Sequence, residues 1–160
     1  MTIVLTILLT ALLAYNIVMH LKHHRKYISF QDTFSNTALP IIPIQINGHT
    51  CNMIVDSGST TSYLDLGLAH NLKMHMTKIN IQTVYMNGRR SSSKMTDTDF
   101  ECAGDKMHGV FLLNNLQNTF KIIAQDTGVE VHGILGSNFM EKHGWVVDYG
   151  AKRIYWPWKK

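Results

Sequence analysis

Two short segments of the 160-residue chain carry the residue types that could do chemistry. In residues 53–59, an apolar stretch leads to Asp56 in the hydroxyl-rich turn Asp-Ser-Gly-Ser. In residues 131–139, the pair Ile134-Leu135 stands between two glycines and leads into a short predicted helix. A carboxylate can take a proton from water while a neighbouring carboxylic acid polarises a carbonyl group. Asp56 is therefore a candidate for acid–base hydrolysis, provided that a second carboxyl lies beside it.

Each segment is weak alone, because Asp-Ser-Gly is common in ordinary turns and a glycine often ends a buried strand. Together and in this order, they resemble the retropepsin-like aspartic proteases, over residues 41–155. The matching motifs are residues 54–59, with Asp56-Ser57-Gly58-Ser59, and the apolar-apolar-glycine motif Ile134-Leu135-Gly136. A hairpin predicted from Val146 to Ile154 is similar to the one that ends bacterial members of the family.

This resemblance implies one lobe of the acid protease fold, a mostly β closed barrel with one or two short helices. It implies that Asp56 is catalytic and that Ser57 reaches to the loop of a partner chain. Gly58 would permit close backbone approach, and Ser59 would donate a hydrogen bond to the outer carboxylate oxygen. Ile134, Leu135 and Gly136 would form the psi-loop strand.

The resemblance also implies a flap over the substrate, within residues 83–94. Its tip would be Met86, Asn87, Gly88 and Arg89, with Asn87-Gly88 as the turn. The arginines at positions 89 and 90 are either solvated turn residues or residues that favour acidic side chains in the substrate.

The chemistry needs two carboxyls, yet the chain has one Asp-Ser-Gly. Asp126-Thr127-Gly128 spells a related tripeptide, but it lies too close to Ile134 to belong to a second lobe, and we interpret it as a turn. Two like charges at hydrogen-bond distance share one proton, so two copies of Asp56 at a two-fold axis would supply both roles. We therefore expect a homodimer.

The elements that must position these residues are predicted to be mainly strands. Pro40 and Pro43 favour an edge strand, and Asn47-Gly48 favours a hairpin turn between residues 44 and 55. Further strands are expected over residues 62–64, 79–86, 94–100, 107–113, 120–124, 145–148 and 153–156. Short helices are expected over residues 66–72 and 137–143, with Ser137 as the N-cap of the second.

Residues 2–21 contain no charged side chain, and fifteen of the twenty are apolar or Tyr. This pattern is typical of a transmembrane helix. A cleavable signal is disfavoured because no basic residue follows Met1 and no small-x-small cleavage motif is present. We expect a membrane anchor at 1–21, a basic flank and polar linker at 22–37, and a protease domain at 38–160. The positive-inside tendency of Lys22, Arg25 and Lys26 places that domain in the cytoplasm.

The net charge of +4 comes from the two ends of the chain, because Lys22, Arg25, Lys26, Lys159 and Lys160 are five of its 15 basic residues. The nearly neutral remainder argues against nucleic-acid binding. Two cysteines are too few for a disulfide scaffold, and whether they are buried thiols or a bridge stays open. The aromatic and basic tail after residue 154 could touch lipid, cover the dimer or end a packed strand.

The sequence thus predicts a membrane-anchored, homodimeric aspartic endopeptidase that acts on polypeptides and needs no cofactor or metal. The lipid bilayer would be a partner through residues 2–21. One alternative is a catalytically silent domain of the same lineage that serves dimerisation or peptide binding. Another is a membrane-tethered β domain unrelated to proteases.

Overall fold

The computed structural model describes residues 2–23, 26–78, 80–84 and 88–157. Five helices and ten strands are found along this part of the chain. In order they are α1 (Thr2–His23), β1 (Lys26–Ser29), α2 (Gln31–Thr37), β2 (Ile41–Ile46), β3 (His49–Asp56), β4 (Tyr63–Asp65), α3 (Leu66–Asn71), β5 (Ile81–Val84), β6 (Arg90–Cys102), β7 (Asp105–Asn114), α4 (Gln117–Thr127), β8 (Gly133–Gly136), α5 (Ser137–His143), β9 (Val146–Asp148) and β10 (Arg153–Trp156). The mostly β fold is as the sequence predicts.

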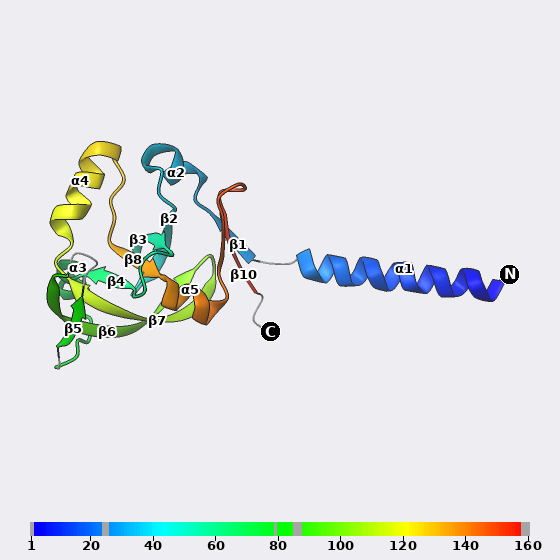
Figure 1. The fold of residues 1–160 in the computed structure, drawn as a ribbon, viewed down its shortest axis with the longest axis horizontal. Coiled ribbons are helices and arrows are strands. Elements are labelled where there is room, and N and C mark those ends of the chain that lie inside the picture. Colours follow the sequence, from blue (N-terminus) through cyan, green and yellow to red (C-terminus); the bar gives the residue numbers. More distant parts are fainter. Residues whose placement is uncertain (1, 24–25, 79, 85–87, 158–160) are drawn as a thin grey trace.

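The larger sheet has seven strands in the order β2-β3-β8-β4-β7-β6-β5 (Figure 1). The β2–β3 hairpin forms as expected, with both turn residues at positive φ, 49° for Asn47 and 78° for Gly48. Most neighbours are antiparallel, but β3–β8 and β4–β7 run parallel. The parallel β3–β8 pair joins segments about 80 residues apart in sequence and brings the two chemically interesting motifs side by side.

The expected closed barrel is present only in part. β2 occupies one edge of the sheet, as Pro43 favours, and pairs with β6 at a single position, Gln45 with Glu101. The long β6–β7 hairpin curves back toward β2 to make this contact, whereas β5 continues the sheet beyond β6. The structure is therefore a curved sheet joined at one point.

Residues 26–37, which lie within the basic flank and linker expected at 22–37, belong to the folded domain. β1 pairs with β10, and β10 pairs with β9, in a separate three-stranded sheet. Phe30 is 1% exposed, and its backbone N–H donates to the Lys152 carbonyl at 3.0 Å. Because β1 has only four residues and its pairing partner lies over 120 residues away, local sequence pattern does not reveal it.

The strand expected at residues 120–124 is wrong, because these residues form the middle of helix α4. Phe120 is buried and Ile123 half-buried, whereas Ile122 between them is 59% exposed. This spacing matches one face of a helix rather than the alternation of a strand. Gly128 ends the helix at φ 73° and donates to the Ala124 carbonyl, so Asp126 lies in the last turn of a helix rather than in an isolated turn.

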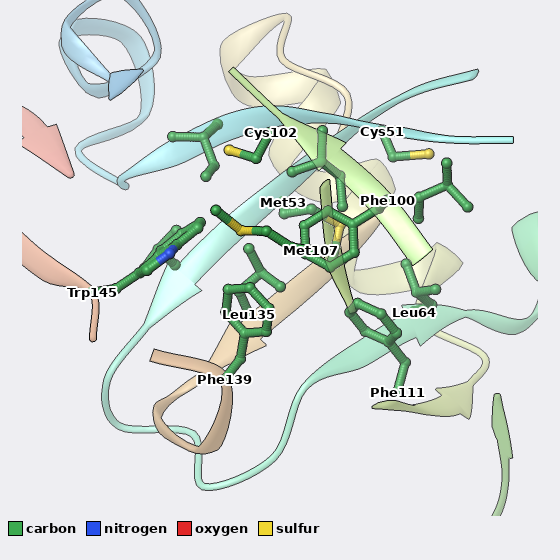
Figure 2. Close-up of a cluster of buried hydrophobic side chains, with 14 of the residues drawn as sticks. Cys51, Met53, Leu64, Phe100, Cys102, Met107, Phe111, Leu135, Phe139 and Trp145 are labelled. Atoms are coloured by element: carbon green, nitrogen blue, oxygen red, sulfur yellow. The ribbon is translucent and has the colours of Figure 1, made fainter. Parts of the chain in front are cut away.

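The main core lies between the large sheet, helix α5 and the terminal sheet (Figure 2). A chain of aromatic contacts runs through it: Phe100 lies 5.4 Å from Phe139, Phe139 lies 4.9 Å from Trp145, and Trp145 stacks on Trp156 at 5.4 Å between ring centroids. A second, smaller cluster forms under α4, around Ile41, Phe120 and Val131. These two cores hold β3 and β8 from opposite faces.

The sequence predicts a helix over residues 2–21, and helix α1 covers this region. It projects away from the rest of the domain (Figure 1). Its large apolar side chains with described exposure are 59–62% exposed: Ile7, Leu8, Leu9, Leu12, Leu13 and Tyr15. Among the described residues, no helix combines the length and the apolar character needed to cross a membrane.

Candidate active site

Strand β3 presents Asp56 at its last position and alternates cleanly between two environments. Cys51, Met53 and Val55 face the main core and are 0–2% exposed. Asn52, Ile54 and Asp56 lie on the opposite face and are half-buried. The period-2 pattern of the strand therefore delivers the Asp56 carboxylate to the surface while its neighbours anchor it from below.

The turn after β3 binds one oxygen of this carboxylate. The Gly58 N–H donates to Asp56 Oδ1 at 2.9 Å, and the Ser59 N–H donates to the Asp56 carbonyl at 3.2 Å. A Cβ on Gly58 would lie 3.2 Å from Asp56 Oδ1, so glycine permits this close approach. Ser57 and Gly58 are exposed, and within the described residues Oδ2 has no hydrogen-bond partner. One carboxylate oxygen is thus held in place and the other is available.

Strand β8 lies beside β3 in parallel, with Ile134 opposite Ile54, Leu135 opposite Val55 and Gly136 opposite Asp56. Gly136 has no room for a side chain, because a Cβ there would meet the Thr61 and Ser59 carbonyl oxygens at 2.6 and 2.7 Å. The apolar-apolar-glycine motif is therefore explained by packing. The structure brings the two sequence motifs together as the sequence led us to expect.

Ser59 and Ser137 differ from their expected roles. The Ser59 hydroxyl donates to the Thr61 carbonyl at 2.7 Å instead of to Asp56. The N-cap of α5 is Gly136, without a side-chain cap, and Ser137 is the first helical residue. Both the backbone N–H and the hydroxyl of Ser137 donate to the Ser59 carbonyl, at 2.7 and 3.1 Å. The two serines hold the Asp56 turn against the start of α5.

Sequence reasoning missed Ser62 and Asn138. Ser62 is 1% exposed, and its hydroxyl accepts from the Gly136 N–H and donates to Asn138 Oδ1, both at 3.0 Å. This link ties β4 to the end of β8 directly behind the Asp56 turn. The only local signal was a small hydroxyl residue before the apolar pair Tyr63-Leu64, which does not indicate a partner 76 positions away.

The predicted flap lies in the hairpin of β5 and β6, whose register runs from Ile81 opposite Ser93 to Val84 opposite Arg90. Met86 and Asn87 lie outside the described residues. Gly88 has φ 77° and is exposed, as is Arg89. The hairpin is confirmed, and its position over a substrate stays a prediction.

A family model described as aspartyl protease matches residues 42–139. The match covers more than half of the chain and includes the Asp56 turn, the Ser62 link and the Ile134-Leu135-Gly136 strand. The chain belongs to the aspartyl protease family. No curated protein matches it significantly in sequence.

Two solved structures of retroviral type are similar to this aspartyl protease family member. EIAV protease, complexed with the inhibitor HBY-793, is 19% identical with a TM-score of 0.48; the alignment covers 65% of this chain and 86% of that one. The retroviral protease-like domain of Ddi1 from Leishmania major is 14% identical with a TM-score of 0.46, covering 74% of this chain and 94% of that one.

In this family member, several other aspartates have structural partners. Asp65 is 7% exposed and accepts from two backbone N–H groups, those of Leu68 at 3.1 Å and Leu116 at 3.0 Å. The remaining pairs are Asp99 with His108, Asp105 with Lys26 and Trp156, and Asp148 with the Ala151 N–H. None of these partners belongs to the Asp56 turn. Among the described residues, no three His, Cys, Asp or Glu side chains gather into a possible metal site.

Proposed function

We propose that the chain is a homodimeric aspartic endopeptidase whose active site forms when two copies bring their Asp56 turns together at a two-fold axis. One observation carries the proposal: Asp56 is held by its own turn and by β8 at the surface, with one carboxylate oxygen still available. Membership of the aspartyl protease family supports protease function. A single chain supplies one such carboxylate, and an isologous interface supplies the second.

The two carboxyls divide the chemistry between them. Because two carboxylates in contact would repel each other strongly, the pair would share one proton. The ionised carboxylate takes a proton from water, whose oxygen attacks the peptide carbonyl carbon, while the protonated carboxyl donates to the carbonyl oxygen. The intermediate then collapses: the carboxyl that took the proton from water gives it to the nitrogen, the C–N bond breaks, a diol hydroxyl returns its proton to the other carboxylate, and two peptide ends leave.

Asp56→Asn is the test of this mechanism, measured as cleavage of a mixture of peptides by the full chain in detergent. Asn keeps an oxygen that can accept from the Gly58 N–H, so the turn should stay folded, but it cannot exchange a proton. We expect cleavage to fall at least about a hundredfold. Sedimentation should show the same dimer for both forms.

Asp97→Asn is the matched control, because Asp97 is exposed on β6, outside the Asp56 turn. It should cleave like the wild type. Undiminished cleavage by Asp56→Asn would overturn the mechanism. If neither the wild type nor the variants cleave although dimers form, the chain is instead a silent dimerisation or peptide-binding module.

The partner-dependent roles belong to the same proposal. Ser57 is exposed at the turn, where its hydroxyl is accessible to a second copy of the turn. The β5–β6 hairpin would close over a polypeptide lying across the two Asp56 residues. Both roles are inferred from the family resemblance.

Membrane attachment is proposed from the sequence alone. It rests on the uncharged stretch at residues 2–21 and the basic residues that follow it. The same pattern favours a cytoplasmic domain. Retention of the full chain in the membrane pellet after an alkaline carbonate wash would support attachment, whereas release into the supernatant would contradict it.

A further inference from the structure

The segment that contains the proposed flap is basic and carries no acidic residue. Residues 66–96 include no Asp or Glu but five exposed basic residues: Lys73, Lys78, Arg89, Arg90 and Lys94. Lys and Arg side chains carry a positive charge at neutral pH. Lys78, Arg90 and Lys94 form no ion pair with any residue that the structure describes. The segment therefore has a positive charge that its own sequence does not balance.

Two of these cations lie on one face of β6, near its beginning. Side chains two positions apart on a strand share a face. Thr96 and Phe100 occupy the even-numbered positions of β6 on the core side and are 2% and 4% exposed. Lys94, Ser92 and Arg90 continue the even-numbered positions toward the hairpin turn, and all three are exposed. The strand face that covers the core thus continues beyond it as an exposed basic surface.

A third cation, Lys78, is brought to the base of the same hairpin by the segment before β5. The Thr77 N–H donates to the Met95 carbonyl at 2.8 Å, and the Thr77 hydroxyl accepts from the Met95 N–H at 2.9 Å. Lys78 follows Thr77 and Lys94 precedes Met95, so the two lysines flank this contact on adjacent segments. Cations from two parts of the chain are therefore gathered at the hairpin.

The nearest carboxylates in sequence do not neutralise this surface. Asp97, Asp99 and Glu101 occupy odd-numbered positions of β6 and are exposed on its opposite face. Asp97, the first of them, is three positions from Lys94, or about 10 Å along the strand, which is comparable to the screening length in physiological salt. Asp99 is already paired with His108 at 2.8 Å. The basic surface is thus open to an acidic partner from outside the chain.

The strand at the edge of this hairpin favours a polypeptide as that partner. β5 is the last strand of the large sheet, and no described strand pairs with its other edge. The hairpin lies at the end of the domain away from the terminal sheet (Figure 1). An edge strand presents backbone N–H and C=O groups that suit an extended polypeptide. Nucleic-acid phosphates would use the cations alone, so the combination favours an acidic polypeptide.

We propose that Lys78, Arg90 and Lys94 form a substrate-selecting surface on the β5–β6 hairpin, through which the enzyme prefers polypeptides with Asp or Glu residues near the cleaved bond. The inference rests on the proposed endopeptidase function and names its substrate class. Each exposed cation contributes little alone, because water and salt screen it, and the preference comes from several acting together. Since the attraction acts during capture of the substrate, it should appear in kcat/KM more than in kcat.

The experiment begins with cleavage of a mixed peptide library by the full chain in detergent, with the products identified by mass spectrometry. A cleaved acidic peptide is then compared with a copy in which Gln and Asn replace its Glu and Asp residues. At low salt, the wild type should cleave the acidic peptide with about fivefold higher kcat/KM than the copy, and this ratio should approach one in high salt. The salt dependence tests the surface without any substitution.

The double variant Arg90→Glu/Lys94→Glu should lower the ratio to one or below at low salt. Its cleavage of the uncharged copy should stay within about twofold of the wild type, which reports that the hairpin is still folded and functional. Lys106→Glu/Lys121→Glu is the matched control, because it changes the net charge equally at two exposed lysines outside residues 66–96. The control should keep the wild-type ratio.

A wild-type ratio of one at low salt, or the same ratio in both double variants, would overturn the substrate-selecting surface and leave the protease function standing. Inhibition of cleavage by single-stranded DNA, together with a peptide ratio of one, would assign the cations to nucleic acid and also overturn the proposal. Absence of cleavage by the wild type would overturn the protease function and the substrate preference with it.

Discussion

The aspartates of this chain show how the environment of a residue separates the proposed catalytic carboxylate from a structural one. Asp65 is buried and both of its oxygens accept backbone N–H groups, so it fixes helix ends. Asp56 accepts one backbone N–H from its own turn and keeps Oδ2 accessible. A group that must exchange protons with water and substrate needs such an unoccupied oxygen. This difference separates Asp56 from Asp65, and the motif around Asp56 separates it from exposed aspartates such as Asp97.

The two cysteines are free and buried, which settles a question that the sequence left open. Burial raises the pKa of the Cys51 thiol from 9.0 to about 11. Burial, with the nearby Asp105 charge as a second cause, raises the pKa of Cys102 to about 12. Since both values are raised, the thiols favour the folded state below pH 9, and this contribution is lost as the pH rises through 11 and 12.

Alkylation tests this prediction, because the thiolate is the reactive form. With its pKa raised by two units, Cys51 has about a hundredfold less thiolate at pH 8 than a free thiol. Iodoacetamide should therefore modify the folded chain at least about a hundredfold more slowly than the urea-unfolded chain. Cys51→Ser and Cys102→Ser separate the two sites, and stoichiometric labelling of the folded chain within minutes would contradict the burial.

At the scale of elements, α4 provides a matched pair of apolar residues on opposite faces. Phe120 is 6% exposed and packs against the cluster beneath β3 and β8, whereas Ile122 is 59% exposed. Phe120→Ala should lower the free energy of unfolding by about 3 kcal/mol or more through lost burial and the remaining cavity. Ile122→Ala should change it by less than about 0.5 kcal/mol. Urea unfolding followed by circular dichroism measures both, and equal effects would mean that residues 117–127 do not pack as this helix.

The sequence predicted the elements whose side-chain pattern is local. The β2–β3 hairpin was predictable because Asn47-Gly48 suits a turn with two positive φ values. Helix α5 was predictable because its buried residues, Phe139 and His143, are spaced four apart, as on one face of a helix. Helix α4 was mistaken for a strand because a five-residue stretch with four apolar residues, Phe120 to Ala124, does not distinguish the two periods. β1 and α2 were missed because β1 pairs with β10, more than 120 residues away, and because Phe30, between β1 and α2, packs into a core built from residues distant in sequence.

The same reason limits what the sequence could say about the candidate site. Asp56 and the Ile134-Leu135-Gly136 strand were predictable from recognisable motifs. The hydrogen bonds of Ser62 to Gly136 and Asn138 join positions more than 70 residues apart, and no spacing rule relates them. A serine hydroxyl also has several acceptors within reach, so the choice of the Thr61 carbonyl by Ser59 required the geometry of the turn.

At the scale of the whole molecule, the proposed site is incomplete in a single chain. The Asp56 turn is exposed, and four other aspartates, Asp65, Asp99, Asp105 and Asp148, have partners elsewhere in the fold. A second copy would meet the first through the same surface, because a two-fold axis places identical residues opposite each other. Catalysis should therefore require two intact Asp56 residues in the same dimer. A dimer with one intact Asp56 should be inactive.

An experiment that mixes wild-type and variant chains distinguishes a site shared by two chains from a site within each chain. Wild-type chain and Asp56→Asn chain are combined in equal amounts in detergent and allowed to exchange subunits before cleavage is measured. If a dimer needs both Asp56 residues, about a quarter of the dimers keep two, so activity should fall to about a quarter of that of the same total amount of wild-type chain. If each chain acts alone, half should remain. Mixing with Ile122→Ala, which alters an exposed side chain of α4, should preserve full activity, so that any loss in the first mixture is assigned to the missing carboxylate and not to dilution or exchange.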